Sequence, residues 1–183
     1  MAPSDNERIT RYDLVTPMLP CKDEILAKFE KFLMSGNYIL GEEVRLLEEE
    51  LAAACGVTDA VGVASGSSAL FVALAMAGVR PGDEVITTPY TFEATIEAVI
   101  MLHARPVFVD IDPRTLNLRP AGVEAAVTSR TRAAIVVHQF GLPADIDTVR
   151  EICERNRIVC VQDAACALGS VYRGEPVGRH GPV

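Results

Sequence analysis

Residues 159–169 read Val159-Cys-Val-Gln-Asp-Ala-Ala-Cys-Ala-Leu-Gly169. The apolar, β-branched start of this stretch is typical of a buried strand, and it stops at a single acid, Asp163. Small residues follow the acid, and none has the bulk to cover its carboxylate. A carboxylate immediately after a buried strand either caps a helix or lies in a ligand site. The stretch alone leaves both interpretations of Asp163 open.

Short apolar runs alternate with segments of helical spacing through the preceding hundred residues. We expect strands at residues 60–64, 84–88, 106–110, 132–137 and 158–162, and helices at residues 67–78, 91–102, 121–128 and 145–156. This alternation predicts an α/β fold with a mostly parallel sheet between helices. Right-handed crossovers bring the carboxyl ends of such strands to one edge of the sheet, where ligands bind.

The N-terminal part has a different pattern. We expect an arm and a first helix over residues 1–35, with the helix at residues 22–35 ended by Gly36. A second helix is predicted at residues 42–55. We expect residues 36–183 to form one larger domain that contains the parallel sheet.

Composition excludes several functional classes. The net charge of −8 argues against a nucleic-acid-binding surface, and no apolar run approaches the length of a membrane span. The cysteines have no metal-ligand spacing, so we expect buried, reduced thiols, no metal site and a cytoplasmic protein. These cysteines are Cys21, Cys55, Cys153, Cys160 and Cys166.

The segment Ala64-Ser-Gly-Ser-Ser-Ala69 lies between a predicted strand and a predicted helix. Gly66 permits a tight turn, and the free N–H groups of the helix start, together with the hydroxyls of Ser67 and Ser68, suit an anion. A plain serine cap of the helix is the competing interpretation. The spacing matches neither a P-loop nor a GxGxxG motif.

Further polar and aromatic residues fall at predicted strand ends. Tyr90 and Phe92 offer flat faces for a planar cofactor, although Phe92 also suits the first core position of its helix. His138 fits a hydrogen-bonded structural role better than a catalytic one. Asp110 and Asp112 fit turn formation ahead of a proline better than metal binding.

These motifs occur in a fixed order along the chain. The order is Ser35-Gly-Asn-Tyr-Ile-Leu-Gly41, Gly66-Ser-Ser68, Pro89-Tyr-Thr-Phe-Glu-Ala-Thr95, Pro106-Val-Phe-Val-Asp-Ile-Asp-Pro113 with Asn117-Leu118, His138-Gln-Phe-Gly-Leu-Pro-Ala-Asp145, and Asp163-Ala-Ala-Cys-Ala-Leu-Gly169. The series resembles the DegT/DnrJ/EryC1/StrS family of sugar aminotransferases. The resemblance implies the large domain of a pyridoxal-phosphate (PLP)-dependent transferase of the aspartate-aminotransferase fold.

The resemblance also implies roles for individual residues. The cofactor phosphate would lie at Gly66, Ser67 and Ser68, while Phe92 would stack on the pyridine ring. Asp163 would pair with the ring nitrogen. Cys166 falls near the ring hydroxyl, where the family usually has Gln or His. Because a thiol is a weak hydrogen-bond partner, we expect altered cofactor binding at that position.

No catalytic residue is assigned, because none of the three lysines matches the family's cofactor-binding lysine. They are Lys22, Lys28 and Lys31. In the family that lysine lies beyond the segment matching residues 177–181, and it bonds to the cofactor and moves the proton. We therefore expect a catalytically incomplete N-terminal portion, with an incomplete large domain and without the C-terminal small domain.

The function that the resemblance implies is amino transfer from an amino-acid donor to a keto-sugar on a nucleotide, with PLP as cofactor. The full-length enzyme would be a homodimer. The alternatives are a relative acting as a dehydratase or as a cyclitol or aromatic aminotransferase, and a non-catalytic short form that binds a partner subunit. An unrelated nucleotide-binding α/β domain is a weaker alternative, because the glycine fingerprint is missing.

Overall fold

Four parallel strands form the central sheet of the computed structural model, which describes residues 13–179. Their order is β2-β1-β3-β4. The strands are β1 (Glu84–Thr87), β2 (Arg105–Phe108), β3 (Thr131–Val137) and β4 (Val159–Asp163). Pro106 lies in β2, at the edge of the sheet, where a residue that lacks an N–H is tolerated. The mostly parallel α/β sheet predicted from the sequence is therefore confirmed.

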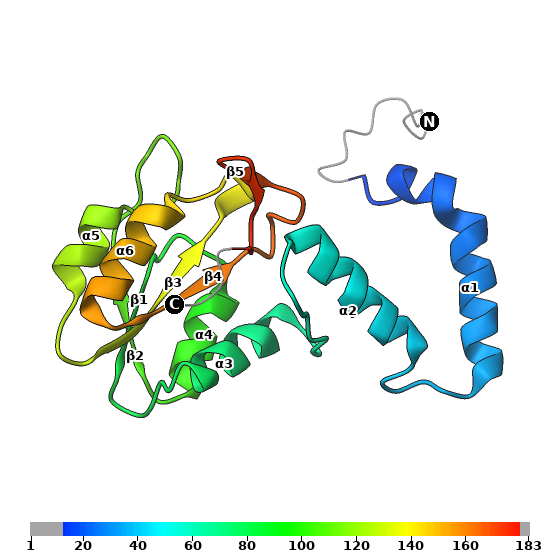
Figure 1. Ribbon diagram of the computed structural model, residues 1–183, viewed down its shortest axis with the longest axis horizontal. Coiled ribbons are helices and arrows are strands. Elements are labelled where there is room, and N and C mark those ends of the chain that lie inside the picture. Colours follow the sequence, from blue (N-terminus) through cyan, green and yellow to red (C-terminus); the bar gives the residue numbers. More distant parts are fainter. Residues whose placement is uncertain (1–12, 180–183) are drawn as a thin grey trace, which may run out of the picture. The chain divides into compact units, whose positions relative to one another are not determined.

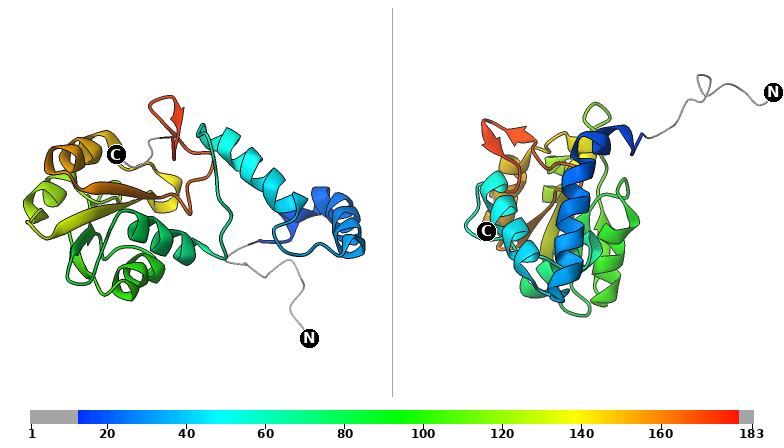
Figure 2. Two further views of the ribbon diagram at one scale, coloured as in Figure 1. Left: turned by 60° about the horizontal axis from the view of Figure 1, so that its bottom comes forward. Right: turned by 90° about the vertical axis from the view of Figure 1, so that its right-hand side faces the viewer.

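Helices cover both faces of this sheet (Figures 1 and 2). On one face lie α3 (Gly66–Met76) and α4 (Glu93–Met101), and on the other lie α5 (Pro120–Ala126) and α6 (Ile146–Asn156). Each face has its own buried apolar cluster. The helices begin and end within a few residues of the sequence-based predictions, because their apolar spacing already marks the buried side.

Side-chain alternation along the strands decides which residues meet which helices. Val161 and Ile135 pack in the cluster of α3 and α4, whereas Cys160 and Val136 pack in the cluster of α5 and α6. Successive strand residues point to opposite faces. Asp163, two positions after Val161, therefore points to the face that α3 and α4 cover.

Contacts within the chain define two compact units, one ending at Arg45 and the other beginning at Leu46. The first contains a 3₁₀ helix, η2 (Thr16–Cys21), where an irregular arm was expected, and α1 (Lys22–Ser35). Gly36 ends α1 at φ 68°, a left-handed conformation that favours glycine, as predicted. Helix α2 (Glu42–Cys55) has its predicted bounds and includes the boundary between the units.

The strand predicted at residues 60–64 is absent from the structure. Val61 is 80% exposed and Val63 is 45% exposed, and none of the four sheet strands pairs with this segment. The N–H of Gly62 instead donates to Glu48 Oε1 at 2.6 Å. Apolar alternation predicts an extended backbone, but a strand also needs a neighbouring strand to complete its hydrogen bonds.

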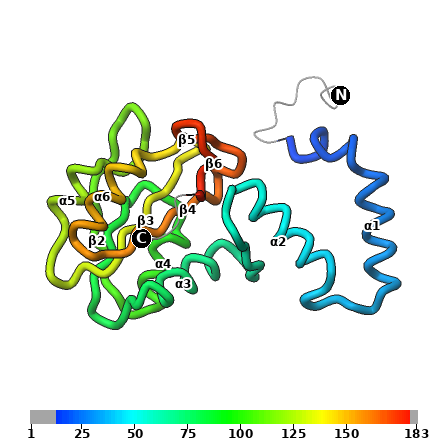
Figure 3. The backbone as a smooth tube through the Cα atoms, viewed as in Figure 1, coloured from blue at the N-terminus to red at the C-terminus, as the bar shows by residue number. Residues whose placement is uncertain are grey.

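A short antiparallel hairpin that the sequence did not predict lies near the end of the described residues. It consists of β5 (Val171–Tyr172) and β6 (Glu175–Pro176) and is traced in Figure 3. Arg173 and Gly174 form its turn, with φ values of 51° and 88°. Positive φ at both central residues fits a two-residue hairpin turn, for which Arg-Gly was the available signal. The sequence has no helix or strand pattern at residues 178–183, and of these, residues 180–183 lie outside the described residues.

The expectation that all the cysteines are buried is wrong. Cys153 and Cys160 are buried, but Cys55 is only half-buried, and Cys21 and Cys166 are exposed. Apolar neighbours in the sequence do not ensure burial, because residues at helix ends and in loops lie outside the layers of the core. Over residues 13–179, no helix has both the length and the apolar character that a membrane crossing requires.

Candidate cofactor site

Asp163 is the last residue of β4, and its carboxylate is held from two sides. Oδ2 accepts a hydrogen bond from the hydroxyl of Thr95 at 3.1 Å, and Oδ1 accepts one from the N–H of Ala165 at 3.2 Å. The side chain is half-buried. A carboxylate has about four acceptor positions, so two bonds leave capacity for a further donor. Asp163 therefore lies at the carboxyl edge of the sheet as an oriented acceptor.

The start of α3 lies on the same face of the sheet as Asp163, because α3 contacts β4 and packs with Val161. Ser65 caps this helix: its Oγ accepts the N–H of Ser68 at 3.1 Å and lies 3.1 Å from the Ser68 hydroxyl. The serine-cap interpretation is thus correct for Ser65. The N–H groups of Gly66 and Ser67 have no acceptor within residues 13–179.

The space beside Gly66 is open. A Cβ placed on Gly66 would meet no atom within 4 Å. The first turn of α3 therefore presents two N–H donors and the half-buried Ser67 side chain beside this open space. Such a helix start favours an anion, because the peptide dipoles add to the effect of the N–H groups.

Phe92 occupies the N-cap position of α4, the next helix on the same face. Its side chain is 73% exposed, so the interpretation of Phe92 as a core residue is wrong. The ring of Tyr90 is 43% exposed and meets Phe140 edge-on, with 6.4 Å between ring centroids. An aromatic face at the sheet edge is thus available for stacking at Phe92.

His138 is buried, and both ring nitrogens have partners. Nδ1 accepts the N–H of Ala144 at 3.0 Å, and Nε2 lies 3.0 Å from Gln162 Oε1. Because Nδ1 accepts, the proton must be on Nε2, which then donates to the glutamine oxygen. The backbone N–H of His138 also donates to the carbonyl oxygen of Asp163 at 3.0 Å. This arrangement supports the structural role that the sequence favoured.

The remaining candidates fall outside this cluster of contacts or keep a local role. Cys166 is an exposed free thiol three residues after Asp163. Asp112 accepts the N–H of Arg114 at 2.8 Å and pairs with its guanidinium, which lowers the pKa of Asp112 to about 2. It therefore forms a turn, as expected. Within residues 13–179, no three His, Cys, Asp or Glu side chains converge as a metal site would need.

Two contributors were not recognised from the sequence. Thr95 is fully buried in α4 and holds Asp163, and Asn117 is buried against the loop that follows β3. The only available signal for Thr95 was its spacing from Thr91, four residues earlier in the helix expected at residues 91–102. Asn117 was part of the ordered motif series, but its position in that series did not predict its contacts with the loop after β3.

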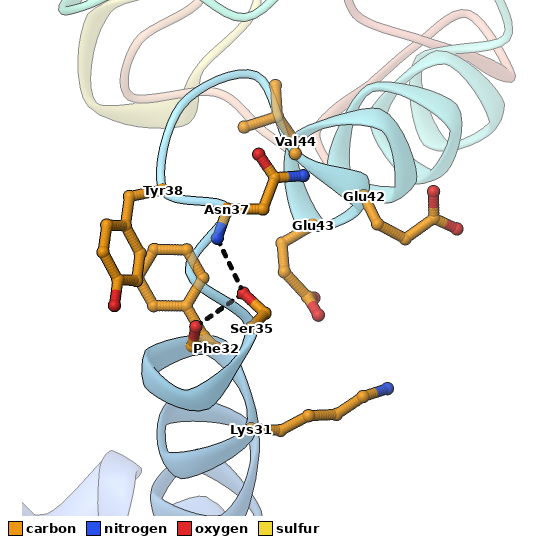
Figure 4. Close-up of a pocket in the computed structure, with 9 residues that line it drawn as sticks. Lys31, Phe32, Ser35, Asn37, Tyr38, Glu42, Glu43 and Val44 are labelled. Atoms are coloured by element: carbon orange, nitrogen blue, oxygen red, sulfur yellow. Dashed lines mark hydrogen bonds between the residues drawn. The ribbon is translucent and has the colours of Figure 1, made fainter.

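A small pocket lies elsewhere, within the unit that ends at Arg45 (Figure 4). At its wall, Ser35 Oγ donates to the carbonyl of Phe32 at 2.7 Å and accepts the N–H of Asn37 at 3.1 Å. None of the six predicted cofactor residues lines it. The lining residues are Lys31, Phe32, Ser35, Asn37, Tyr38, Gly41, Glu42, Glu43 and Val44.

Solved structures share this fold over most of the chain. DesV of S. venezuelae, in complex with a ketimine intermediate, has a TM-score of 0.91 and 42% identity, with 93% of this chain and 46% of that chain covered. NtdA of Bacillus subtilis, with the cofactor PMP bound, has a TM-score of 0.80 and 28% identity, with 92% and 41% covered.

Sequence comparison also finds aminotransferases among the relatives of this chain. The UDP-N-acetyl-3-dehydro-alpha-D-glucosamine 3-aminotransferase of Acidithiobacillus ferrooxidans is 42% identical over 180 residues, covering 98% of this chain and 49% of that protein. The chain spans about half the length of the curated relatives it matches. The model of one family matches residues 20–183, nearly the whole chain. The chain therefore belongs to the DegT/DnrJ/EryC1/StrS aminotransferase family.

Proposed function

We propose that this chain holds PLP for an aminotransferase that moves an amino group from an amino acid, such as glutamate or glutamine, to a keto-sugar carried on a nucleotide. The observation that carries the proposal is the placement of Asp163, an oriented carboxylate on the face of the sheet where α3 and α4 begin. NtdA supports the cofactor, since PMP is the amino form of PLP. The A. ferrooxidans relative supports a nucleotide-sugar acceptor.

The described residues fit this cofactor. The N–H groups of Gly66 and Ser67 suit the phosphate, and the open space beside Gly66 lets it approach the backbone. The Ser67 and Ser68 hydroxyls add donors, although that of Ser68 is shared with Ser65. The exposed face of Phe92 suits stacking on a pyridine ring.

Asp163 and Cys166 would tune the ring. Bound PLP supplies a pyridinium ring that withdraws electrons from the reacting carbon. The Asp163 carboxylate would accept the ring N–H of bound PLP and thereby keep the nitrogen protonated. The family resemblance suggests that Cys166 would face the ring hydroxyl, and its thiol would be a weak hydrogen-bond partner there. Of these two contacts, only the weak one at Cys166 would depart from the pattern that the family resemblance implies.

Titration of the purified chain with PLP tests the cofactor assignment. We expect Asp163→Asn to weaken PLP binding about 10- to 100-fold, because a hydrogen bond to a charged group contributes about 1.5–3 kcal/mol. Asp110→Asn is the matched control, since Asp110 is an exposed acid outside the site. Pyridoxal without phosphate should bind more weakly than PLP. Binding of NAD in place of PLP, or unchanged PLP affinity in Asp163→Asn, would contradict the assignment.

A separate assay tests amino transfer. We expect no amino-sugar product from this chain with PLP, glutamate and a nucleotide keto-sugar, because its three lysines all lie in α1 and none is a residue of the proposed site. Detection of product by mass spectrometry would show that another group performs the proton transfer. Such a result would overturn the expectation of an incomplete catalytic set while leaving the cofactor site intact.

A further inference from the structure

Thr95 carries a buried hydroxyl within a helix. The residue is fully buried in α4, and its side chain reaches Asp163 at the end of β4. Its Oγ1 lies 3.1 Å from Asp163 Oδ2 and 2.9 Å from Thr91 Oγ1. Threonine is a poor helix former, and a buried hydroxyl is unfavourable unless it is hydrogen-bonded. The position therefore depends on these two contacts.

The direction of the two hydrogen bonds follows from the chemistry of the carboxylate. An ionised carboxylate only accepts, so Thr95 must donate to Asp163. Its oxygen is then free to accept the hydroxyl proton of Thr91. The chain of donors runs from Thr91 to Thr95 to Asp163. It ends at Asp163 Oδ2, one of the two carboxylate oxygens that could accept the proposed ring N–H.

The remaining contacts of Asp163 come from the backbone. Oδ1 accepts the N–H of Ala165, and the main-chain carbonyl of Asp163 accepts the N–H of His138. These bonds fix the strand end and one carboxylate oxygen. The other oxygen depends on a side chain from α4, the helix whose N-cap residue is Phe92. Thr95 thus links the ring-stacking position to the acid.

We propose that Thr95 is a positioning residue that orients the Asp163 carboxylate toward the ring nitrogen of the cofactor. This inference rests on the proposed PLP site. Without the Thr95 hydroxyl, Oδ2 loses its donor and the carboxylate rotates more freely about its χ angles. A less ordered acceptor pairs less well with the ring N–H, although the charge of Asp163 is unchanged.

Three threonine variants separate this role from simple packing. Thr95→Val removes the hydroxyl and keeps the shape, and Thr95→Ser keeps the hydroxyl. Thr87→Val is the matched control, because Thr87 is equally buried and its hydroxyl donates to the carbonyl of Ile135 at 3.3 Å, away from Asp163. All are made in the full chain.

The first readout is PLP labelled with nitrogen-15 in the ring. We expect Thr95→Val to lower the pKa of the bound ring nitrogen and to weaken PLP binding about 3- to 10-fold, the loss of one typical hydrogen bond. Thr95→Ser should restore both values, and Thr87→Val should match the unmodified chain. If Thr95→Val leaves the nitrogen titration unchanged, or Thr87→Val changes it equally, the proposal is wrong.

The second readout needs no cofactor. The carboxyl carbon of Asp163, labelled with carbon-13, should shift in Thr95→Val and return in Thr95→Ser. If the unmodified chain fails to bind PLP while this pattern holds, the proposed function falls and Thr95 still positions Asp163. If the carboxyl resonance is the same in all variants, the positioning role is overturned whatever the cofactor result.

Discussion

Asn117 holds Gln139 through a hydrogen bond of 3.0 Å from the Gln139 N–H to Asn117 Oδ1. The same side chain donates from Nδ2 to the carbonyl of Leu142, also at 3.0 Å. Both ends of one buried amide therefore fix the loop between β3 and α6. That loop follows directly on His138, whose backbone is bonded to Asp163.

Replacement of Asn117 with alanine should lower the free energy of unfolding by about 1–3 kcal/mol, because buried loop groups lose their partners. Amide hydrogen exchange at residues 138–142 should accelerate as well. Asn37→Ala, the same change at an exposed residue, should stay within about 0.5 kcal/mol in chemical denaturation. Equal stability of the two variants would show that the Asn117 bonds are dispensable.

The environment of Glu84, at the amino end of β1, predicts that the stability of the folded chain depends on pH. Its buried carboxylate accepts a hydrogen bond from the Thr128 hydroxyl at 2.6 Å and one from Arg130 at 2.6 Å. The Thr128 bond first, and then Arg130, hold the pKa of Glu84 below its ordinary value of 4.5. A depressed carboxyl pKa stabilises the folded state above about pH 4.5, and that stabilisation is lost as pH falls through the folded pKa.

Glu84→Gln should therefore lower the free energy of unfolding at pH 7 by about 1–3 kcal/mol, since it removes the charge that faces Arg130. The difference from the unmodified chain should shrink below about pH 4.5. Glu124→Gln is the control: Glu124 forms an exposed ion pair with Arg155, so the change should be at most about 1 kcal/mol. A Glu84 effect that persists undiminished at low pH would rule out the charge as its cause.

Phe92 should contribute to cofactor binding without contributing much to stability. Because its ring is 73% exposed, Phe92→Ala should leave thermal unfolding nearly unchanged. Loss of stacking, worth about 0.5–1.5 kcal/mol, should weaken PLP binding about 2- to 10-fold. Phe108→Ala, at the end of the edge strand β2 and 49% exposed, should not affect PLP affinity. Titration with PLP compares the two variants directly.

Cys166→Gln should tighten PLP binding about 2- to 10-fold, because an amide forms a stronger hydrogen bond than a thiol. Cys21→Gln makes the same change at another exposed cysteine, outside the proposed site, and should leave the affinity unaltered. Unchanged affinity in Cys166→Gln would show that position 166 does not reach the ring hydroxyl.

Helix and strand positions were largely predictable. The apolar spacing of residues 22–35 and 42–55 gave helices with the observed bounds, and the glycine after the first of them ends it as predicted. Local sequence carries this information because burial on one side of a helix repeats every three to four residues. The strand predicted at residues 60–64 was wrong, because strand formation depends on a neighbouring strand and not on local sequence alone.

The sequence by itself determined the parallel α/β architecture, the family, and the position of Asp163 at a strand end. Only the tertiary structure showed that Thr95, 68 positions earlier in the chain, holds that carboxylate, and that Phe92 is exposed while His138 is buried with both ring nitrogens bonded. Periodicity reports which side of an element is buried. It does not report which polar groups meet across the sheet edge, because those hydrogen bonds join residues that only folding brings together.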